Sequence, residues 1–190
     1  MSEIKSFIDI EGWFSNEDAK FIQDICSHVK QGTIIEIGCF KGRSTASWIK
    51  TAIRNHNEVY IIDNFFGGIN AETEASKIQR KDGNKIKEIF IENMEQLGVH
   101  RSDYHLYHCN SIDAIKYFKD NSIDMVFVDS DHAYESVVSD IKNWWPKIIK
   151  NGILSGHDYN NLDVKRAVNE FALKNNLKVS MGGNCWKINK

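Results

Sequence analysis

The sequence predicts an α/β fold in which helices cover both faces of a doubly wound, mostly parallel sheet of seven strands. Short runs of Ile, Val, Phe and Tyr alternate along the chain with stretches whose apolar residues have helical spacing. Such alternation is typical of parallel strands joined by right-handed crossover helices. The last two apolar runs flank Gly182, Gly183 and Asn184, so we expect a terminal hairpin that adds an antiparallel edge strand.

The helices are predicted from apolar residues spaced three or four positions apart. The first follows a cap at residues 15–18 (Ser-Asn-Glu-Asp) and carries apolar residues from Phe21 to Val29. Further helices are predicted over residues 45–53, 85–97, 112–118, 134–149 and 164–173. Residues 64–84 contain Gly67, Gly68 and alternating charges without a regular period. We expect an irregular segment there, suited to a mobile lid that shapes the substrate site together with the N-terminal segment.

The strands are predicted from short apolar runs that end in a polar residue or a turn. They cover residues 34–38, 59–63, 104–109, 123–129 and 152–155, and the hairpin pairs residues 177–181 with 185–188. In open parallel sheets, ligands bind beyond the carboxyl ends of the strands. We therefore expect the residues that follow each strand to form the functional site.

Length and composition fit a single domain. A chain of 190 residues with 42% apolar residues can bury a full core. We expect one domain over residues 1–190, with residues 1–31 as an N-terminal helical segment and residues 32–190 as the core. Pro146 is the single proline, so no proline-rich linker marks a second domain.

Several classes of protein are disfavoured by the composition. The formal net charge of −2 argues against a dedicated nucleic-acid binder. No apolar run approaches membrane-spanning length, and the N-terminus lacks the apolar core of a signal peptide. The four cysteines lie far apart without a C-x-x-C pair, which indicates reduced thiols. We expect a cytoplasmic protein without nucleic-acid or membrane partners. Assembly into a homo-oligomer is compatible with the sequence.

A glycine turn follows the first predicted strand, with the pattern Glu36-x-Gly38-x-x-x-Gly42. A dinucleotide fold needs a further glycine where this chain has Phe40, and a P-loop needs four residues between its glycines and then a lysine. Here three residues separate the glycines, and Arg43 follows. A cofactor without phosphates and with positive charge fits better, because Glu36 could hold its charged end. S-adenosylmethionine meets both conditions. Alternatively, Glu36 orients the backbone of the turn.

An acid closes the second predicted strand. Asp63 follows Gly38 by 25 residues, and an acid at about this distance commonly binds ribose hydroxyls. The alternative is an acid that caps the following turn. The spacing favours the ribose role because the glycine turn accompanies it.

A second polar cluster follows the fourth and fifth strands. Asp129 closes an apolar strand, where an unpaired carboxylate would be costly, so it needs a partner. His132 lies at the next helix start, where a neutral imidazole could accept a proton from a hydroxyl group. A helix cap is the alternative role for His132. Asp129, His157 and Asp158 could together bind a divalent cation such as Mg²⁺ or Mn²⁺, and the alternative is a hydrogen-bonded cluster without metal.

These motifs resemble those of a known family. Residues 36–45 resemble the cofactor motif of class I S-adenosylmethionine-dependent methyltransferases, which have a Rossmann-like fold. Residues 127–135, Asp140 and residues 156–159 resemble small O-methyltransferases near the macrocin and cephalosporin-pathway type, distantly related to catechol O-methyltransferases. The resemblance spans roughly residues 12–187.

The resemblance also implies roles for individual residues. Asp63 would bind the ribose, and Asn110 and Ser111 would flank the adenine. The methionine pocket would be shaped by Glu36, Gly38, Gly42, Ser44 and Thr45. In metal-dependent relatives the magnesium ligands fall at the positions of Asp129, His157 and Asp158, and His132 takes the place of a lysine base. His157 departs from the carboxylate or carbonyl ligand that relatives often have.

The sequence therefore predicts an enzyme that transfers a methyl group from S-adenosylmethionine to a hydroxyl of a small molecule, such as a sugar or a secondary metabolite. His132 and Asp129 are the catalytic candidates. Two alternatives stay open. One is an NAD-linked oxidoreductase, against which Phe40 argues. The other is a non-catalytic S-adenosylmethionine-binding protein, which the retained Asp129, His132 and Asp158 disfavour.

Overall fold

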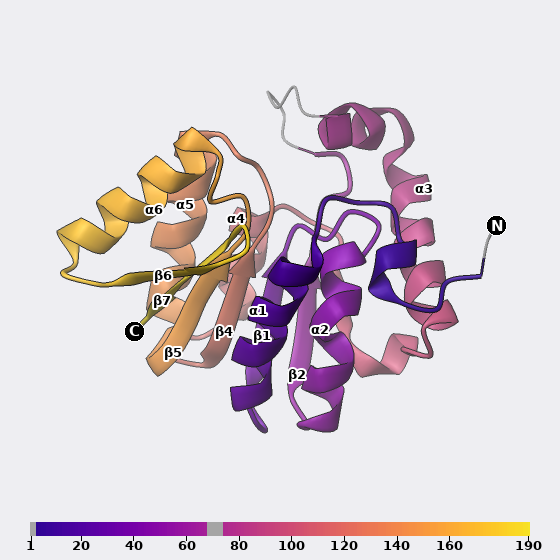
Figure 1. The fold of residues 1–190 in the computed structure, drawn as a ribbon, viewed down its shortest axis with the longest axis horizontal. Helices are drawn as coiled ribbons and strands as arrows, with labels where there is room; N and C mark the ends of the chain where they lie inside the picture. Colours follow the sequence, from indigo (N-terminus) through magenta and orange to yellow (C-terminus); the bar gives the residue numbers. More distant parts are fainter. Residues whose placement is uncertain (1–2, 68–73) are drawn as a thin grey trace.

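A seven-stranded sheet runs through the part of the chain that the computed structural model describes, residues 3–67 and 74–190 (Figure 1). Its strands are β1 (Thr33–Ile37), β2 (Glu58–Ile62), β3 (His105–Tyr107), β4 (Ile123–Val128), β5 (Ile148–Gly156), β6 (Val179–Gly182) and β7 (Cys185–Asn189). They lie in the order β3-β2-β1-β4-β5-β7-β6. The first five pair in parallel, which confirms the predicted fold class.

The terminal hairpin is also confirmed. β7 pairs antiparallel with β5 and with β6, so the strand of opposite direction lies one place inside the edge strand β6. On the other side, the strand order reverses between β1 and β4. Such a switch point opens a crevice beyond the carboxyl ends of the strands.

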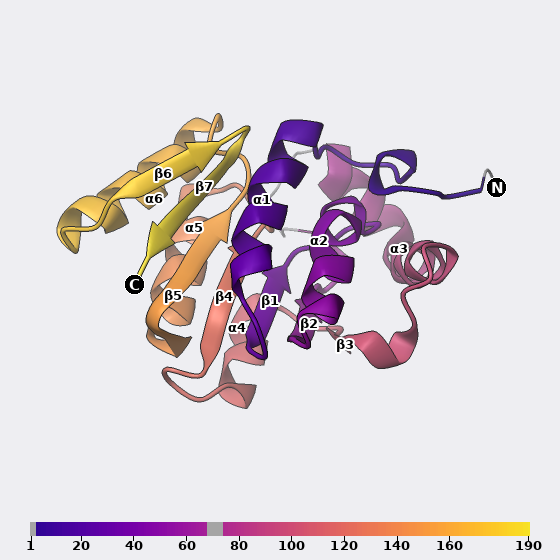
Figure 2. The same ribbon diagram turned by 60° about the horizontal axis from the view of Figure 1, so that its bottom comes forward.

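Two helical layers cover the sheet (Figure 2). One face packs against α1 (Asn16–His28), α2 (Arg43–Arg54) and α3 (Glu74–Gln96); the other packs against α4 (Ser111–Ala114), α5 (Tyr134–Trp144) and α6 (Leu162–Lys174). Short 3₁₀ turns are η1 (Phe7–Asp9), η2 (Arg101–Asp103), η3 (Ile115–Tyr117) and η4 (Trp145–Lys147). Successive side chains of β1 point to opposite faces of the sheet. Ile34 therefore packs in the core beneath α1 to α3, and Ile35 packs in the core beneath α4 to α6.

The predicted start of α1 is confirmed by a capping box. The backbone N of Asp18 donates to Ser15 Oγ (3.2 Å), and the backbone N of Ser15 donates to Asp18 Oδ2 (2.8 Å). This reciprocal pair fixes the N-terminus of α1 beside the sheet. Asp18 is itself buried, so its carboxylate lies among residues of the protein interior.

The two largest differences from the predicted boundaries are at the start of α3 and the end of α5. α3 begins at Glu74 rather than Lys85, so the prediction of an irregular segment is wrong for residues 74–84. Charged residues hide the helical period there, while Ile78 still packs on the core and only Asp82 has non-helical angles. Residues 68–73 of the expected lid lie outside the described part. α5 ends at Trp144, because the chain turns through η4 at Pro146 and β5 already begins at Ile148.

Among the described helices, none combines the length and the apolar character needed to cross a membrane. All four cysteines are unpaired, and Cys26, Cys39 and Cys185 are buried.

Candidate active site

A cleft of about 1400 Å³ lies beyond the carboxyl ends of the parallel strands. Its walls come from the N-terminal segment, the glycine turn after β1 and the loops after β2 to β5. The predicted site residues in its lining are Gly38, Ser44, Asp63, Asn110, Ser111, Asp129, His132, His157 and Asp158. Glu36, Gly42 and Thr45 are not part of the lining and lie behind it. The fold thus gathers most of the predicted site into one cavity.

Gly38 is required by a close approach of backbone segments. Its φ is +83°, and a Cβ atom would lie 2.2 Å from the carbonyl oxygen of Asp129. The backbone N of Asp129 in turn donates to Ile37 O (2.8 Å). Any side chain at this position would push the loops after β1 and β4 apart, so Gly38 allows these two loops to pack against each other.

Glu36 ties β1 to the first turn of α2. Ser44 Oγ donates to Glu36 Oε1 (2.6 Å), and Thr45 Oγ1 donates to Glu36 Oε2. Burial raises the pKa of Glu36 to about 8, with Asp129 and Asp63 adding to the effect. Its contacts are those of the alternative role, an acid that orients the turn, and it reaches the cleft through Ser44.

Asp63 joins the glycine turn to the loop after β2. Its Oδ2 accepts from the backbone N of Cys39 (2.8 Å) and Phe40 (2.9 Å), and its Oδ1 accepts from the backbone N of Phe65 (2.6 Å). A carboxylate has about four acceptor positions, so about one is left for a ribose hydroxyl. Asp63 therefore shapes the turn that it was predicted to accompany, and the ribose role stays a prediction.

The loop after β3 contacts a buried acid, Asp140, to which the sequence assigns no role. Ser111 Oγ donates to Asp140 Oδ1 (2.6 Å), and Ser130 Oγ donates to Asp140 Oδ2 (2.8 Å). Trp144 Nε1 donates to Ser111 Oγ (2.8 Å). Burial raises the pKa of Asp140. Its position between Val137 and Ile141 on the buried face of α5 is the sequence feature that could have revealed it.

His132 and Asp158 form a dyad in the cleft. His132 Nε2 lies 2.8 Å from Asp158 Oδ2. This hydrogen bond raises the pKa of His132 above its ordinary value, against the opposing effect of burial. Asp158 has a φ of +56°, a strained conformation that is common at functional sites. One ligand atom from each of Asp129, His132 and Asp158 lies within 4.8 Å of the others.

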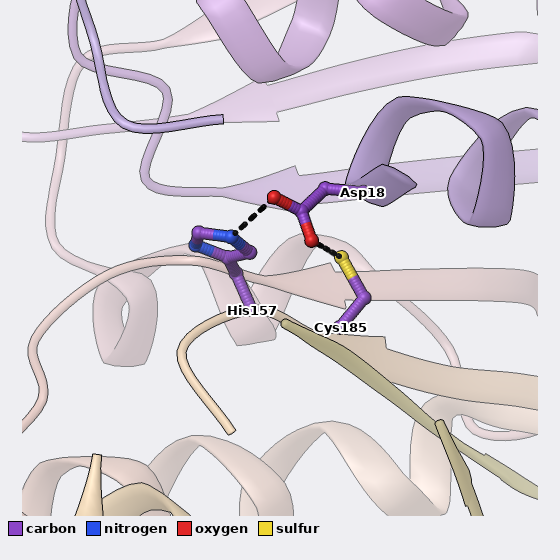
Figure 3. Close-up of side chains that lie close together, drawn as sticks. All are labelled: Asp18, His157 and Cys185. Atoms are coloured by element: carbon purple, nitrogen blue, oxygen red, sulfur yellow. Dashed lines mark hydrogen bonds and ion pairs between the residues drawn. The ribbon is translucent and has the colours of Figure 1, made fainter. Parts of the chain in front are cut away.

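His157 lies deeper, between three carboxylates. Its Nδ1 is 3.5 Å from Asp129 Oδ1 and 3.3 Å from Asp158 Oδ2. Its Nε2 points toward Asp18, 3.3 Å from Oδ2, and Cys185 Sγ approaches the other oxygen of Asp18 (Figure 3). Burial alone would lower the pKa of His157, but the three carboxylates raise it to about 12.

The environment of His157 separates the two imidazoles of the site. Both nitrogens of His157 face carboxylates, at 3.3–3.5 Å. The side chain that the geometry groups with Asp129 and Asp158 as a donor is His132, whereas the sequence analysis named His157. The metal site itself stays a prediction.

The N-terminal segment forms one wall of the cleft, where Arg43 holds it. Arg43 Nε donates to Phe14 O (2.9 Å), and Arg43 Nη1 donates to Ile8 O (3.1 Å) and Ile10 O (2.8 Å). Trp13 stacks obliquely on Phe40 with 5.7 Å between ring centroids, and it keeps 58% of its surface exposed. The sequence predicts that this segment shapes the substrate site, but it assigns no role to Arg43.

Comparison with protein families gives the decisive assignment. Residues 35–159 match the family described as a methyltransferase domain. The chain belongs to this methyltransferase family. The match covers both clusters, from the glycine turn to Asp158, and argues against the NAD-linked oxidoreductase alternative. No curated protein sequence gives a significant match.

Solved structures place the methyltransferase in a common fold. The O-methyltransferase NovP has 16% identity, with a TM-score of 0.70 over 90% of this chain and 78% of that one. An S-adenosylmethionine-dependent O-methyltransferase from Thermotoga maritima has 11% identity, with a TM-score of 0.68 over 100% and 71%. A putative caffeoyl-CoA O-methyltransferase from Staphylococcus aureus has 11% identity, with a TM-score of 0.66 over 96% and 87%. At these identities the likeness shows the fold alone.

Proposed function

We propose that this methyltransferase transfers a methyl group from S-adenosylmethionine to a hydroxyl oxygen of a small molecule, such as a sugar or a secondary metabolite. One observation carries the proposal. The glycine turn with Asp63 and the His132–Asp158 dyad line the same cleft, so a cofactor and an acceptor bound there would share one cavity. Methyl transfer needs this alignment of donor and acceptor.

The cofactor side of the cleft suits S-adenosylmethionine. When bound, this cofactor supplies an electrophilic methyl group on a positively charged sulfur. Asp63 would accept a ribose hydroxyl, while Gly38 and Ser44 would border the methionine end. Asn110 and Ser111 would flank the adenine at the start of α4. The carboxylates of the lining complement the positive charge of the cofactor.

His132 is the proposed proton acceptor. Its imidazole takes the proton of the acceptor hydroxyl, so that an oxygen lone pair becomes available for the transfer. Asp158 holds the ring at 2.8 Å and stabilises the imidazolium that results. Asp129, the other catalytic candidate, lies beside Asp158 and faces His157 Nδ1 at 3.5 Å.

A divalent cation is a second candidate for activating the hydroxyl. The donor set of Asp129, His132 and Asp158 offers two carboxylates and one imidazole within 4.8 Å, which suits Mn²⁺ and, through its oxygens, Mg²⁺. Such an ion would supply Lewis-acid chemistry that lowers the pKa of the acceptor hydroxyl. His132 would then be a ligand and not the base.

Calorimetry with S-adenosylmethionine, S-adenosylhomocysteine and NAD tests the proposal first. We expect the first two ligands to bind and NAD not to bind, and the opposite result would refute the assignment. Transfer of a labelled methyl group to a panel of hydroxyl acceptors then tests catalysis. Cofactor binding without transfer to any acceptor would favour the alternative of a non-catalytic S-adenosylmethionine-binding protein.

A further inference from the structure

We infer that the acceptor carries a positive charge, as an amine-bearing hydroxyl compound does, and bears no phosphate or carboxylate. This inference rests on the proposed function. It begins with the charges that line the cleft. The acidic residues of the lining are Glu11, Asp18, Asp63, Asp129, Asp131, Glu135, Asp140 and Asp158. Arg43 is the only lysine or arginine among the described residues of the lining.

Most of these acids already have partners within the protein. Asp63 is bound by backbone N–H groups and Asp140 by two serines. His157 faces three more of them, Asp18, Asp129 and Asp158. Glu11 pairs with Lys41 at 2.6 Å. Hydrogen bonds leave the negative charge of Asp63 in place, and His157 offers one positive charge to three carboxylates, so the cleft keeps a net negative charge.

Two acids of the lining near His132, Asp131 and Glu135, form no ion pair with a described residue. Asp131 accepts from Ser136 Oγ (2.9 Å) and from the backbone N of Ala133 (3.3 Å). Glu135 is exposed and makes no hydrogen bond or ion pair within the described part of the chain. S-adenosylmethionine carries one net positive charge, so Asp131 and Glu135 leave further negative charge for the acceptor to balance.

The cleft also lacks what an anionic acceptor needs. Phosphates and carboxylates are usually held by arginine, lysine or a free helix N-terminus. Arg43 is engaged by three backbone carbonyls, and the first turn of α5 already carries Glu135. The sequence of residues 68–73 adds no lysine or arginine. Acceptors carried on a nucleotide or on coenzyme A are therefore disfavoured.

An aromatic surface in the same cleft favours a cation independently. Trp13 and Phe40 both line the cleft and stack on each other, and Trp13 is 58% exposed. An ammonium group over a tryptophan ring gains about 0.5–2 kcal/mol. Aromatic faces together with carboxylates are the usual recognition elements for organic cations.

Three catechols that differ in side-chain charge test the inference. Dopamine is cationic, 4-methylcatechol is neutral, and 3,4-dihydroxyphenylacetate is anionic. Calorimetry on the protein saturated with S-adenosylhomocysteine gives their dissociation constants. We expect dopamine to bind about tenfold more tightly than 4-methylcatechol, and the anion to bind more weakly than both.

Two charge-reversal variants distinguish the effect of charge in the cleft from the effect of the net charge of the protein. Glu135→Lys should remove the preference for dopamine, whereas Glu88→Lys, the same change on the exposed surface of α3 outside the cleft, should keep it. Equal affinities, tighter binding of the anion, no binding of any catechol, or an unchanged preference in Glu135→Lys would overturn the inference. S-adenosylmethionine binding, measured on the same samples, distinguishes the two proposals. Absence of binding would refute both the proposed function and the cationic acceptor. Binding without a preference for the cationic catechol would refute only the cationic acceptor.

Discussion

Replacing Asp63 by alanine should damage both the fold and the cofactor site. Three backbone N–H groups, from Cys39, Phe40 and Phe65, donate to its carboxylate at 2.6–2.9 Å. The glycine turn after β1 and the loop after β2 are joined through these bonds. An acid that only bound ribose could be removed without this cost, so the effect on stability distinguishes the two roles.

The size of the effect follows from these three bonds. A hydrogen bond to a charged group contributes about 1.5–3 kcal/mol to stability. Asp63 is 7% exposed at the wall of an open cleft, so water can replace part of the loss. We expect the free energy of unfolding to fall by about 2–4 kcal/mol, a large share of the stability of a typical domain. Loss of the ribose bond should weaken cofactor affinity by about 10–100-fold.

Urea denaturation followed by tryptophan fluorescence measures the first effect, and calorimetry under folding conditions measures the second. Asp103→Ala is the matched control, because its exposed carboxylate accepts the backbone N of His100 (2.7 Å) far from the cleft. It should cost about 1 kcal/mol or less and leave cofactor affinity unchanged. An Asp63→Ala protein as stable as the control would refute the role of Asp63 in the turn.

Four further predictions concern the same cleft. Glu36→Gln should flatten the pH dependence of stability between pH 5 and 8 in denaturation curves, because the pKa of Glu36 is raised to about 8 when folded and stability is lost as pH rises through that value. His132→Ala should cut turnover about 10²–10⁴-fold with cofactor affinity intact, and wild-type turnover should fall as pH drops through the raised pKa of His132. Gly38→Ala should lower the Tm and abolish cofactor binding, whereas Gly98→Ala, also at positive φ but in open space, should only lower the Tm. If activity needs a divalent cation, a chelator should mimic Asp129→Ala, and full activity in chelator would leave His132 as the base.

Local sequence patterns were enough to predict the strands and the edge of the sheet at which the candidate site lies. The period of the apolar residues and the spacing of Gly38, Gly42 and Asp63 depend on a few neighbouring positions, and parallel strands bring their ends together by topology alone. The start of α3 was missed because its charged surface masks the helical period. Sequence could not show that Glu36 lies behind the cleft wall, since this depends on the direction of a side chain.

The imidazoles of His132 and His157 show a second limit of prediction from the sequence. His132 and His157 both follow a strand end, and nothing local distinguishes them. The difference arises because Asp18, which is 139 positions before His157, packs against it from α1 and adds a third carboxylate. That contact exists only in the folded protein, so the carboxylates that surround His157 could not be read from spacing.

Asp18 also sets an order in which the protein is completed during synthesis. Its Oδ1 accepts the backbone N of Asn184 (2.6 Å), a residue 166 positions later in the hairpin turn. Strands β1 to β3 and the glycine turn have all left the ribosome long before this partner exists. The corner that holds His157 thus closes only when the last strands arrive, after the residues of the cofactor side have been synthesised. We therefore expect catalytic competence to be acquired only when the growing polypeptide is nearly complete.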